Sequence, residues 1–201
     1  MLYLLKNVVM RKLYILLSSL ILILLASSFA YTSYDTYNNN ASNTVVITGY
    51  IDSTCSNNDG RTLELYVDGN VDLSGWSVNV QNNGSGFTNS IDLTSLGVIN
   101  DAFVYITNNA AVLNSEFGIS SNIIVDSSIE SDGDEAFQVV DNTLSVLDQF
   151  GVENVDGTNT DWEHSDSFFY RQNGVVSNNG NFDASNWDFG DLNLLDNDGL
   201  C

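Results

Sequence analysis

The chain has 201 residues, a length typical of one domain with a short additional segment. It contains 26 acidic and 5 basic residues, and three of the basic residues but none of the acidic ones precede residue 31. The rest of the chain therefore sets two arginines against 26 carboxyl groups, which excludes direct binding to nucleic acid or to an anionic membrane, because both need a basic surface. A hydrophobic content of 43% indicates a packed core rather than an acidic disordered chain.

Residues 1–30 have the pattern of an export signal. The basic pair Arg11–Lys12 precedes an apolar run over 13–26, and residues 28–30 (SFA) place small side chains at the cleavage positions. Counted from Met10, the signal has ordinary length, so Met10 is an alternative start of the protein. We expect cleavage after residue 30 and a protein in the medium or at the cell surface, with no membrane segment left. The alternative is an uncleaved membrane anchor, for which the apolar run is short.

The chain has two cysteines, Cys55 and Cys201. In an oxidising compartment an even number of cysteines favours a disulfide, so we expect these two to pair and to tie the C-terminus to an early loop. The alternative is two free thiols or a bond between chains.

The remaining residues alternate between short strand patterns and turns. Residues 31–43 are polar and rich in asparagine, and they predict a flexible leader before a domain over 44–201. Residues 110–117 favour a single helical turn. Strands are predicted over 45–51, 63–68, 76–81, 87–93, 102–107, 123–125, 136–140, 144–150 and 168–171. This spacing predicts an all-β protein, an antiparallel β-sandwich.

The turn over 68–76 illustrates the local logic. Gly69 and Gly75 provide turn conformations. Leu73, just before Gly75, and Trp76, just after it, are expected to enter the core.

Four motifs in a fixed order resemble the lamin-tail domain family. They are VVITGYI (45–51), LELYVDGNVDLSGWSV (63–78), AFVYIT (102–107) and SDGDEAFQVVDNTLSVLDQFG (131–151). The resemblance covers residues 44–199 and implies an immunoglobulin-like β-sandwich, a fold that does not by itself determine an activity.

Two further stretches, 155–174 and 182–190, are similar to a variant of that family found in secreted bacterial nucleases. There the domain lies beside a separate catalytic domain, so the resemblance implies an accessory or degenerate member of a nuclease system as one alternative. Because residue 201 closely follows these stretches, we expect no catalytic domain in this chain.

The residues themselves offer little catalytic chemistry, and we expect no catalytic residue. His164 is the only histidine, and although Ser165, Ser167 and nearby carboxylates allow a Ser-His-Asp set on paper, a surface or capping histidine is the simpler interpretation. Zinc is not expected, since one histidine and two cysteines do not make a usual site.

Calcium is the ion that the oxygen-rich acidic turns favour. None of these turns has the spacing of an EF-hand, and acidic turns are commonly just solvated, so calcium is a hypothesis rather than a required cofactor. The candidate ligands are Asp132, Asp134, Glu135, Asp156, Asp161, Asp196 and Asp198.

The aromatic residues of the C-terminal third are expected to fill the core, with an exposed platform for a sugar or a partner as the alternative. Arg61 is expected to pair with Glu64 or Asp68, and Arg171 is expected to have a structural role, with docking as its alternative. The aromatic residues concerned are Trp162, Phe168, Phe169, Tyr170, Trp187 and Phe189.

These observations favour an exported, non-enzymatic interaction or adhesion module that binds a protein or a surface polymer. Besides the nuclease alternative, the sequence leaves open a structural subunit of an extracellular polymer, a homo-oligomer held by the terminal cysteine or by sheet edges.

Overall fold

Alternation of apolar and polar residues builds the strands, as the second strand shows. Leu63, Leu65 and Val67 are buried there, while the residues between them are partly exposed. The computed structural model describes residues 43–55, 58–174 and 176–196. The predicted signal, all but the last residue of the predicted leader, Asp198 and Cys201 lie outside these residues.

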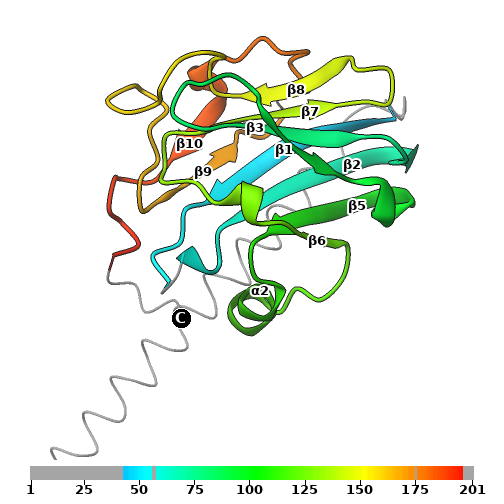
Figure 1. Ribbon diagram of the computed structural model, residues 1–201, viewed down its shortest axis with the longest axis horizontal. Coiled ribbons are helices and arrows are strands. Elements are labelled where there is room, and N and C mark those ends of the chain that lie inside the picture. Colours follow the sequence, from blue (N-terminus) through cyan, green and yellow to red (C-terminus); the bar gives the residue numbers. More distant parts are fainter. Residues whose placement is uncertain (1–42, 56–57, 175, 197–201) are drawn as a thin grey trace, which may run out of the picture. The chain divides into compact units, whose positions relative to one another are not determined.

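The strands form two sheets (Figure 1). The six-stranded sheet has the order β10-β9-β1-β2-β5-β6, and the four-stranded sheet has the order β4-β3-β7-β8. The strands are β1 (Thr44–Ile51), β2 (Thr62–Asp72), β3 (Ser77–Gln81), β4 (Asn89–Asp92), β5 (Val98–Thr107), β6 (Ile123–Val125), β7 (Ala136–Val140), β8 (Val146–Phe150), β9 (Phe168–Arg171) and β10 (Trp187–Phe189).

Among the described residues, every strand pair is antiparallel except β5 and β6, which are parallel. A parallel pair needs a crossover connection, and α2 (Ala110–Phe117) provides it. The predicted helical turn is thus a helix of 8 residues, begun by the Asn109 side chain and ended by Gly118 in the left-handed conformation. Short 3₁₀ turns occupy η2 (Thr94–Leu96), η3 (Ser127–Ile129) and η4 (Ala184–Asn186).

The structure therefore confirms an all-β, sandwich-like architecture, with one parallel pair that the purely antiparallel prediction missed. It also adds β10, which the strand predictions omitted. Leu73 and Trp76 are buried as expected, and Gly69 and Gly75 have positive φ.

The aromatic residues of the C-terminal third form the centre of the core. Phe150 stacks on Phe169 at a centroid distance of 3.5 Å, and Trp162 and Trp187 meet Phe150 edge to face. The core prediction is wrong for Tyr170, which is 50% exposed, and for Phe168, which is partly exposed on the same side of β9. Phe168 and Tyr170 alternate with Phe169 along β9 and lie on the outer side of the sheet.

Arg171 provides a hydrogen-bond partner for β1 at the point where the pairing of β1 with β9 ends. β1 has an irregularity between Ile47 and Gly49, and only its last three residues pair with β9. The Ile47 amide donates to Asp148 at 2.7 Å, and Arg171 Nε donates to the Ile47 carbonyl at 2.6 Å. Arg171 also forms a buried ion pair with Asp148 and lies 4.2 Å from the Trp187 ring centroid. This supports the predicted structural role of Arg171, because the pair satisfies backbone groups that no strand reaches.

Arg61 has a different partner from the two that the sequence suggested. Its Nε lies 2.8 Å from the Asp52 carboxylate, and the two form a buried ion pair. The Asp166 amide donates to the other Asp52 oxygen at 2.8 Å. Burial raises the pKa of Asp52 to about 7, against the opposing effect of Arg61.

Cys55 is buried, and its sulfur lies 2.8 Å from the Ser53 hydroxyl. Because Cys201 lies outside the described residues, the disulfide stays a prediction. No helix in the part of the chain described here is long and apolar enough to cross a bilayer.

Candidate functional site

The first candidate site is the acidic turn, residues 131–135, between η3 and β7. Asp132, Asp134 and Glu135 each place a carboxylate oxygen within 4.8 Å of the others, and within the described ranges they are the one such group of three. Asp132 is exposed, whereas Asp134 and Glu135 are buried. Three of the seven predicted calcium ligands therefore do come together.

Glu135 is held by its own turn. One oxygen of its carboxylate, Oε2, accepts hydrogen bonds from the Ser131 hydroxyl, from the Asp132 amide at 3.0 Å and from the Asp134 amide at 3.3 Å. Gly133 makes this turn possible, because it has a φ of +94° and a Cβ there would overlap the Ser165 backbone.

The long loop over 151–167 encloses the acidic turn. The His164 amide donates to the Gly133 carbonyl at 2.7 Å, and the Gly157 amide donates to the Asp134 carbonyl at 3.1 Å. The Thr158 hydroxyl donates to Asp134 Oδ2 at 2.8 Å. Asp134 Oδ1 is buried without a hydrogen-bond partner, so one carboxylate oxygen inside the cluster has no donor.

The electrostatics of the acidic turn favour a bound positive charge. Burial raises the pKa of Glu135 to about 8, and the charges of Asp132 and Asp134 add to the effect. Burial also raises the pKa of Asp134, and the Asp132 charge acts in the same direction. A proton or a cation is needed to neutralise such a group, and hard oxygen ligands of this kind suit calcium.

The other calcium candidates have different places. Asp156 is exposed beside the acidic turn. Hydrogen bonds from the Thr158 amide and hydroxyl are the main cause of its lowered pKa, and a hydrogen bond with Asp134 adds a smaller effect in the same direction. Asp161 and Asp196 are exposed and outside the cluster, and Asp198 lies beyond the described residues. The sequence could not show that Asp156 returns to the acidic turn, because the course of the 20 intervening residues, 136–155, determines it.

His164 is enclosed in the aromatic core rather than presented to solvent. Its ring is fully buried and meets Tyr50, Phe150 and Phe169 edge to face. Burial lowers the pKa of His164 to about 4, against the opposing Trp162 carbonyl. Ser165 donates instead to the Asp132 carbonyl at 3.0 Å and to Glu163 at 3.3 Å. The Ser167 hydroxyl and His164 Nε2 are both buried without a hydrogen-bond partner, so neither serine bonds the ring. The Ser-His-Asp set drawn from the sequence therefore does not form, and His164 is a core residue rather than a surface or capping one.

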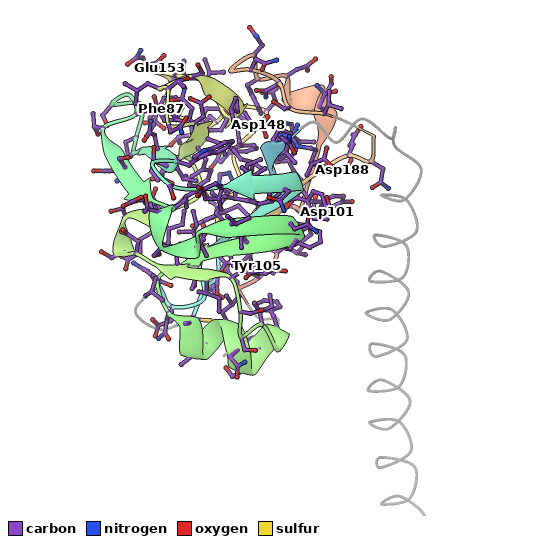
Figure 2. All side chains as sticks on the ribbon, turned by 90° about the vertical axis from the view of Figure 1, so that its right-hand side faces the viewer. Phe87, Asp101, Tyr105, Asp148, Glu153 and Asp188 are labelled. Carbon is purple, nitrogen blue, oxygen red and sulfur yellow. The ribbon has the colours of Figure 1, made fainter. Side chains whose placement is uncertain are left out.

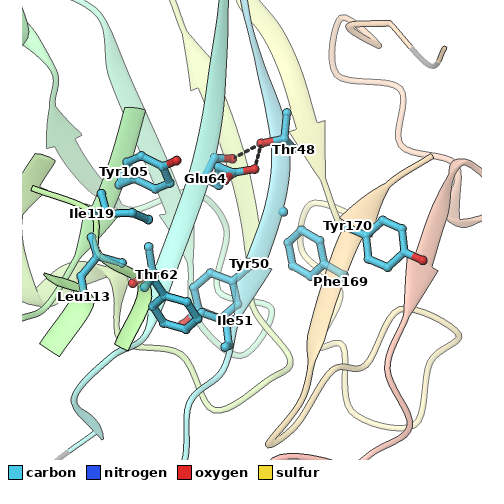
Figure 3. Close-up of a pocket in the computed structure, with 12 residues that line it drawn as sticks. Thr48, Tyr50, Ile51, Thr62, Glu64, Tyr105, Leu113, Ile119, Phe169 and Tyr170 are labelled. Carbon is cyan, nitrogen blue, oxygen red and sulfur yellow. Dashed lines mark hydrogen bonds between the residues drawn. The ribbon is translucent and has the colours of Figure 1, made fainter. Parts of the chain in front are cut away.

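A second candidate site lies on the outer face of the six-stranded sheet, which sequence reasoning missed. A pocket of about 230 Å³ opens there against α2. Its lining includes Gly49, Glu64, Tyr105, Leu113 and Tyr170. Figure 3 shows Glu64 between Tyr105 and Thr48. Leu113 lies on the same side of Glu64 as Tyr105, and Tyr170 lies on the same side as Thr48.

The strand register explains this pocket. Tyr170 pairs with Gly49, Gly49 with Glu64, and Glu64 with Tyr105, so one lateral row crosses four strands. Gly49 leaves a gap in that row, and a Cβ there would lie 2.9 Å from the Phe169 carbonyl oxygen. The signal in the sequence was the alternation of β2, where Glu64 and Tyr66 alternate with buried apolar residues.

Glu64 is partly buried at the base of this pocket. The Thr48 hydroxyl donates to Glu64 Oε1 at 2.8 Å. Burial raises the pKa of Glu64, against hydrogen bonds from Thr48 and Tyr105.

The fold and these two sites define an all-β sandwich with an acidic turn and an aromatic outer face. Comparison of the chain with protein-family models, with curated proteins and with solved structures finds no match. The resemblance to lamin-tail domains thus remains an expectation from the sequence motifs.

Proposed function

We propose that this chain is an exported, non-enzymatic interaction module with an immunoglobulin-like sandwich of lamin-tail type. It acts at the cell surface or in the medium and binds a protein or a surface polymer through the outer face of its six-stranded sheet. The observation behind this proposal is the aromatic character of that face.

The outer faces of the two sheets differ in chemistry. On the six-stranded sheet, the rings of Tyr66 and Phe103 pack at 5.0 Å, and Phe103 stacks with Tyr105 at 6.5 Å. All three residues are partly exposed. On the four-stranded sheet, the polar Asn79 of β3 pairs with the polar Gln138 of β7 on the outer side, and the apolar residues of β7 on that side are buried. Apolar surface that remains exposed on one face commonly marks a binding site.

A binding experiment with two matched variants tests this proposal. Phe103→Ser removes a ring from the aromatic face, and Asn79→Ser is the control on the polar face. Fluorescently labelled protein is applied to cells and to purified cell-surface polymer of the source organism. We expect Phe103→Ser to weaken binding at least tenfold and Asn79→Ser to leave it unchanged. Equal binding by both variants would contradict the proposed surface.

The non-enzymatic part needs its own test. Purified protein is incubated with supercoiled DNA in Ca²⁺ and Mg²⁺, with EDTA as control, across a range of pH. Nicking that follows the protein peak and disappears in EDTA would overturn this part of the proposal. The buried position of His164 supports the opposite outcome, because a general base must reach its substrate.

We further propose that the acidic turn binds Ca²⁺, which would fix the loop over 151–167. The support is the unpartnered, buried Asp134 Oδ1 among three carboxylates. Calcium at a hundred times its Kd would stabilise the fold by about 2.7 kcal/mol, so the melting temperature should rise on adding CaCl₂ to EDTA-treated protein. Asp134→Asn should abolish the rise, and the exposed Asp161→Asn should preserve it. An equal rise in both variants would refute a site at the acidic turn.

The polymer alternative that relies on strand addition at sheet edges has less support. The outermost strands of the sheets, β10, β6, β4 and β8, have three to five residues each, and short edges are poor templates for strand addition.

A further inference from the structure

We propose that the pocket at Gly49 and Glu64 receives the ammonium group of a lysine side chain from a basic protein partner. The inference rests on the proposed interaction function and names the chemistry of the partner. It follows from three features of the structure: the carboxylate without a cation, the shape of the pocket, and the charge of the surrounding surface.

Glu64 has no cationic neighbour among the described residues. Residues 43–196 contain two arginines and no lysine. Arg61 is paired with Asp52 and Arg171 with Asp148, both inside the fold. A partly buried carboxylate is costly unless it is paired, so a cation from outside would relieve that cost.

The pocket fits a primary ammonium on a flexible apolar stem. The Glu64 carboxylate lies at one end of it beside the Thr48 and Tyr105 hydroxyls. Both hydroxyls direct their protons to Glu64 and keep oxygen lone pairs that can accept, which suits the three N–H donors of lysine. Leu113 and Phe117 from α2 provide apolar wall for the methylene stem. A quaternary ammonium would leave the oxygen acceptors unused, and a guanidinium prefers a carboxylate whose two oxygens are both open.

The charge of the surface decides which partner can supply the group. Both arginines and the single histidine of the described region are buried, so its formal surface charges are acidic. Such a surface attracts basic proteins over a distance and repels further copies of itself. A second copy of the described region cannot fill the pocket either, because it contains no lysine.

The test uses three short peptides that differ in one side chain: Ac-Gly-Gly-Lys-Gly-Gly-NH₂, its Nε-acetyl-lysine form and its arginine form. Each is titrated into purified ¹⁵N-labelled protein at low salt. We expect the lysine peptide to shift the amides of Gly49, Glu64 and Tyr105, and to bind about tenfold more tightly than either other peptide. Equal binding of the acetylated peptide would reduce the site to an apolar groove and overturn the inference. Equal binding of the arginine peptide would show general attraction to an acidic surface and would also overturn it.

Two protein variants locate the effect. Glu64→Gln removes the charge but keeps a similar shape, and we expect it to weaken the lysine peptide at least tenfold. Glu153→Gln removes the same charge from an exposed loop residue at the opposite end of the sandwich from Tyr105 (Figure 2) and should change nothing. Equal affinities in the two variants would refute the role of Glu64. Thermal melts establish that both variants fold, and Thr48→Val provides a second, uncharged perturbation of the same pocket, expected to weaken the lysine peptide.

The outcome separates this inference from the proposed function. If Glu64→Gln still binds the cell surface while Phe103→Ser does not, the aromatic face is the interaction surface and the lysine inference is wrong. If neither variant affects surface binding and the lysine peptide does not bind, both proposals fail.

Discussion

Protonation of His164 should destabilise the fold, because its ring is enclosed by aromatic side chains. Nδ1 lies 3.2 Å from the Trp162 carbonyl, so this nitrogen carries the proton of the neutral ring and donates it there. Nε2 is buried without a partner, and a second proton would place a charge there without an acceptor. Asp132 is the one carboxylate that favours the charged ring, and it does not offset burial.

The sign and size of the effect follow from the two pKa values. Unfolded histidine takes up a proton near pH 6.5, whereas folded His164 does so at about pH 4. Between these values the unfolded state binds more protons, so stability is present above pH 6.5 and is lost as the pH falls toward 4. The full difference corresponds to about 3 kcal/mol of unfolding free energy.

The assay compares the wild type with His164→Leu by urea unfolding, followed by tryptophan fluorescence, from pH 7 to pH 4.5. The leucine variant loses the bond to the Trp162 carbonyl, which lowers its stability by a constant amount. Asp52 and Glu135, whose raised pKa values act in the opposite direction, are present in both proteins and cancel in the difference. The wild type should lose most of the 3 kcal/mol relative to the variant over this range. Parallel pH profiles would refute a neutral, buried His164.

Three other substitutions test the packing by the same urea assay at pH 7. Arg171→Met leaves Asp148 buried and unpaired, and should lower the unfolding free energy by about 3–5 kcal/mol; a loss below 1 kcal/mol would contradict the role of the pair. Phe150→Ala removes the ring stacked on Phe169 and should cost about 3–5 kcal/mol with an unchanged m-value. Gly133→Ala forces Cβ into the Ser165 backbone at a positive φ and should destabilise by about 2 kcal/mol or more, whereas Gly174→Ala, where the space is open, should cost less.

Local patterning accounts for most of the fold that the sequence could predict. β-branched and aromatic composition, together with alternation in segments such as 63–68 and 76–81, identified nine of the ten strands. The sequence pattern did not predict that β5 and β6 are parallel, and it did not predict β10. Strand direction depends on the crossover through α2. β10 (WDF) is short and contains no β-branched residue, whereas the equally short β6 (IIV) is entirely β-branched.

The ion pairs show where proximity in sequence misleads. Glu64 and Asp68 are near Arg61 along the chain, but residues at odd and even positions of β2 point to opposite faces. Arg61 therefore turns inward to Asp52, and Glu64 turns outward to the pocket. The acidic turn could be predicted because its three carboxylates are adjacent in sequence, whereas the long-range approach of Asp156 could not.

The contact between Arg171 and the first strand makes the beginning of the domain dependent on its end. Until residue 171 has been synthesised, Ile47 lacks a partner for its carbonyl, and Asp148 lacks its counter-ion. The last three residues of β1 also have one open edge until β9 exists. A growing chain therefore cannot complete its first strand early, and contacts over such sequence separations slow folding. A protein cut before Phe168 should accumulate as an incompletely folded chain with an exposed sheet edge, a form that proteases and neighbouring chains would both recognise.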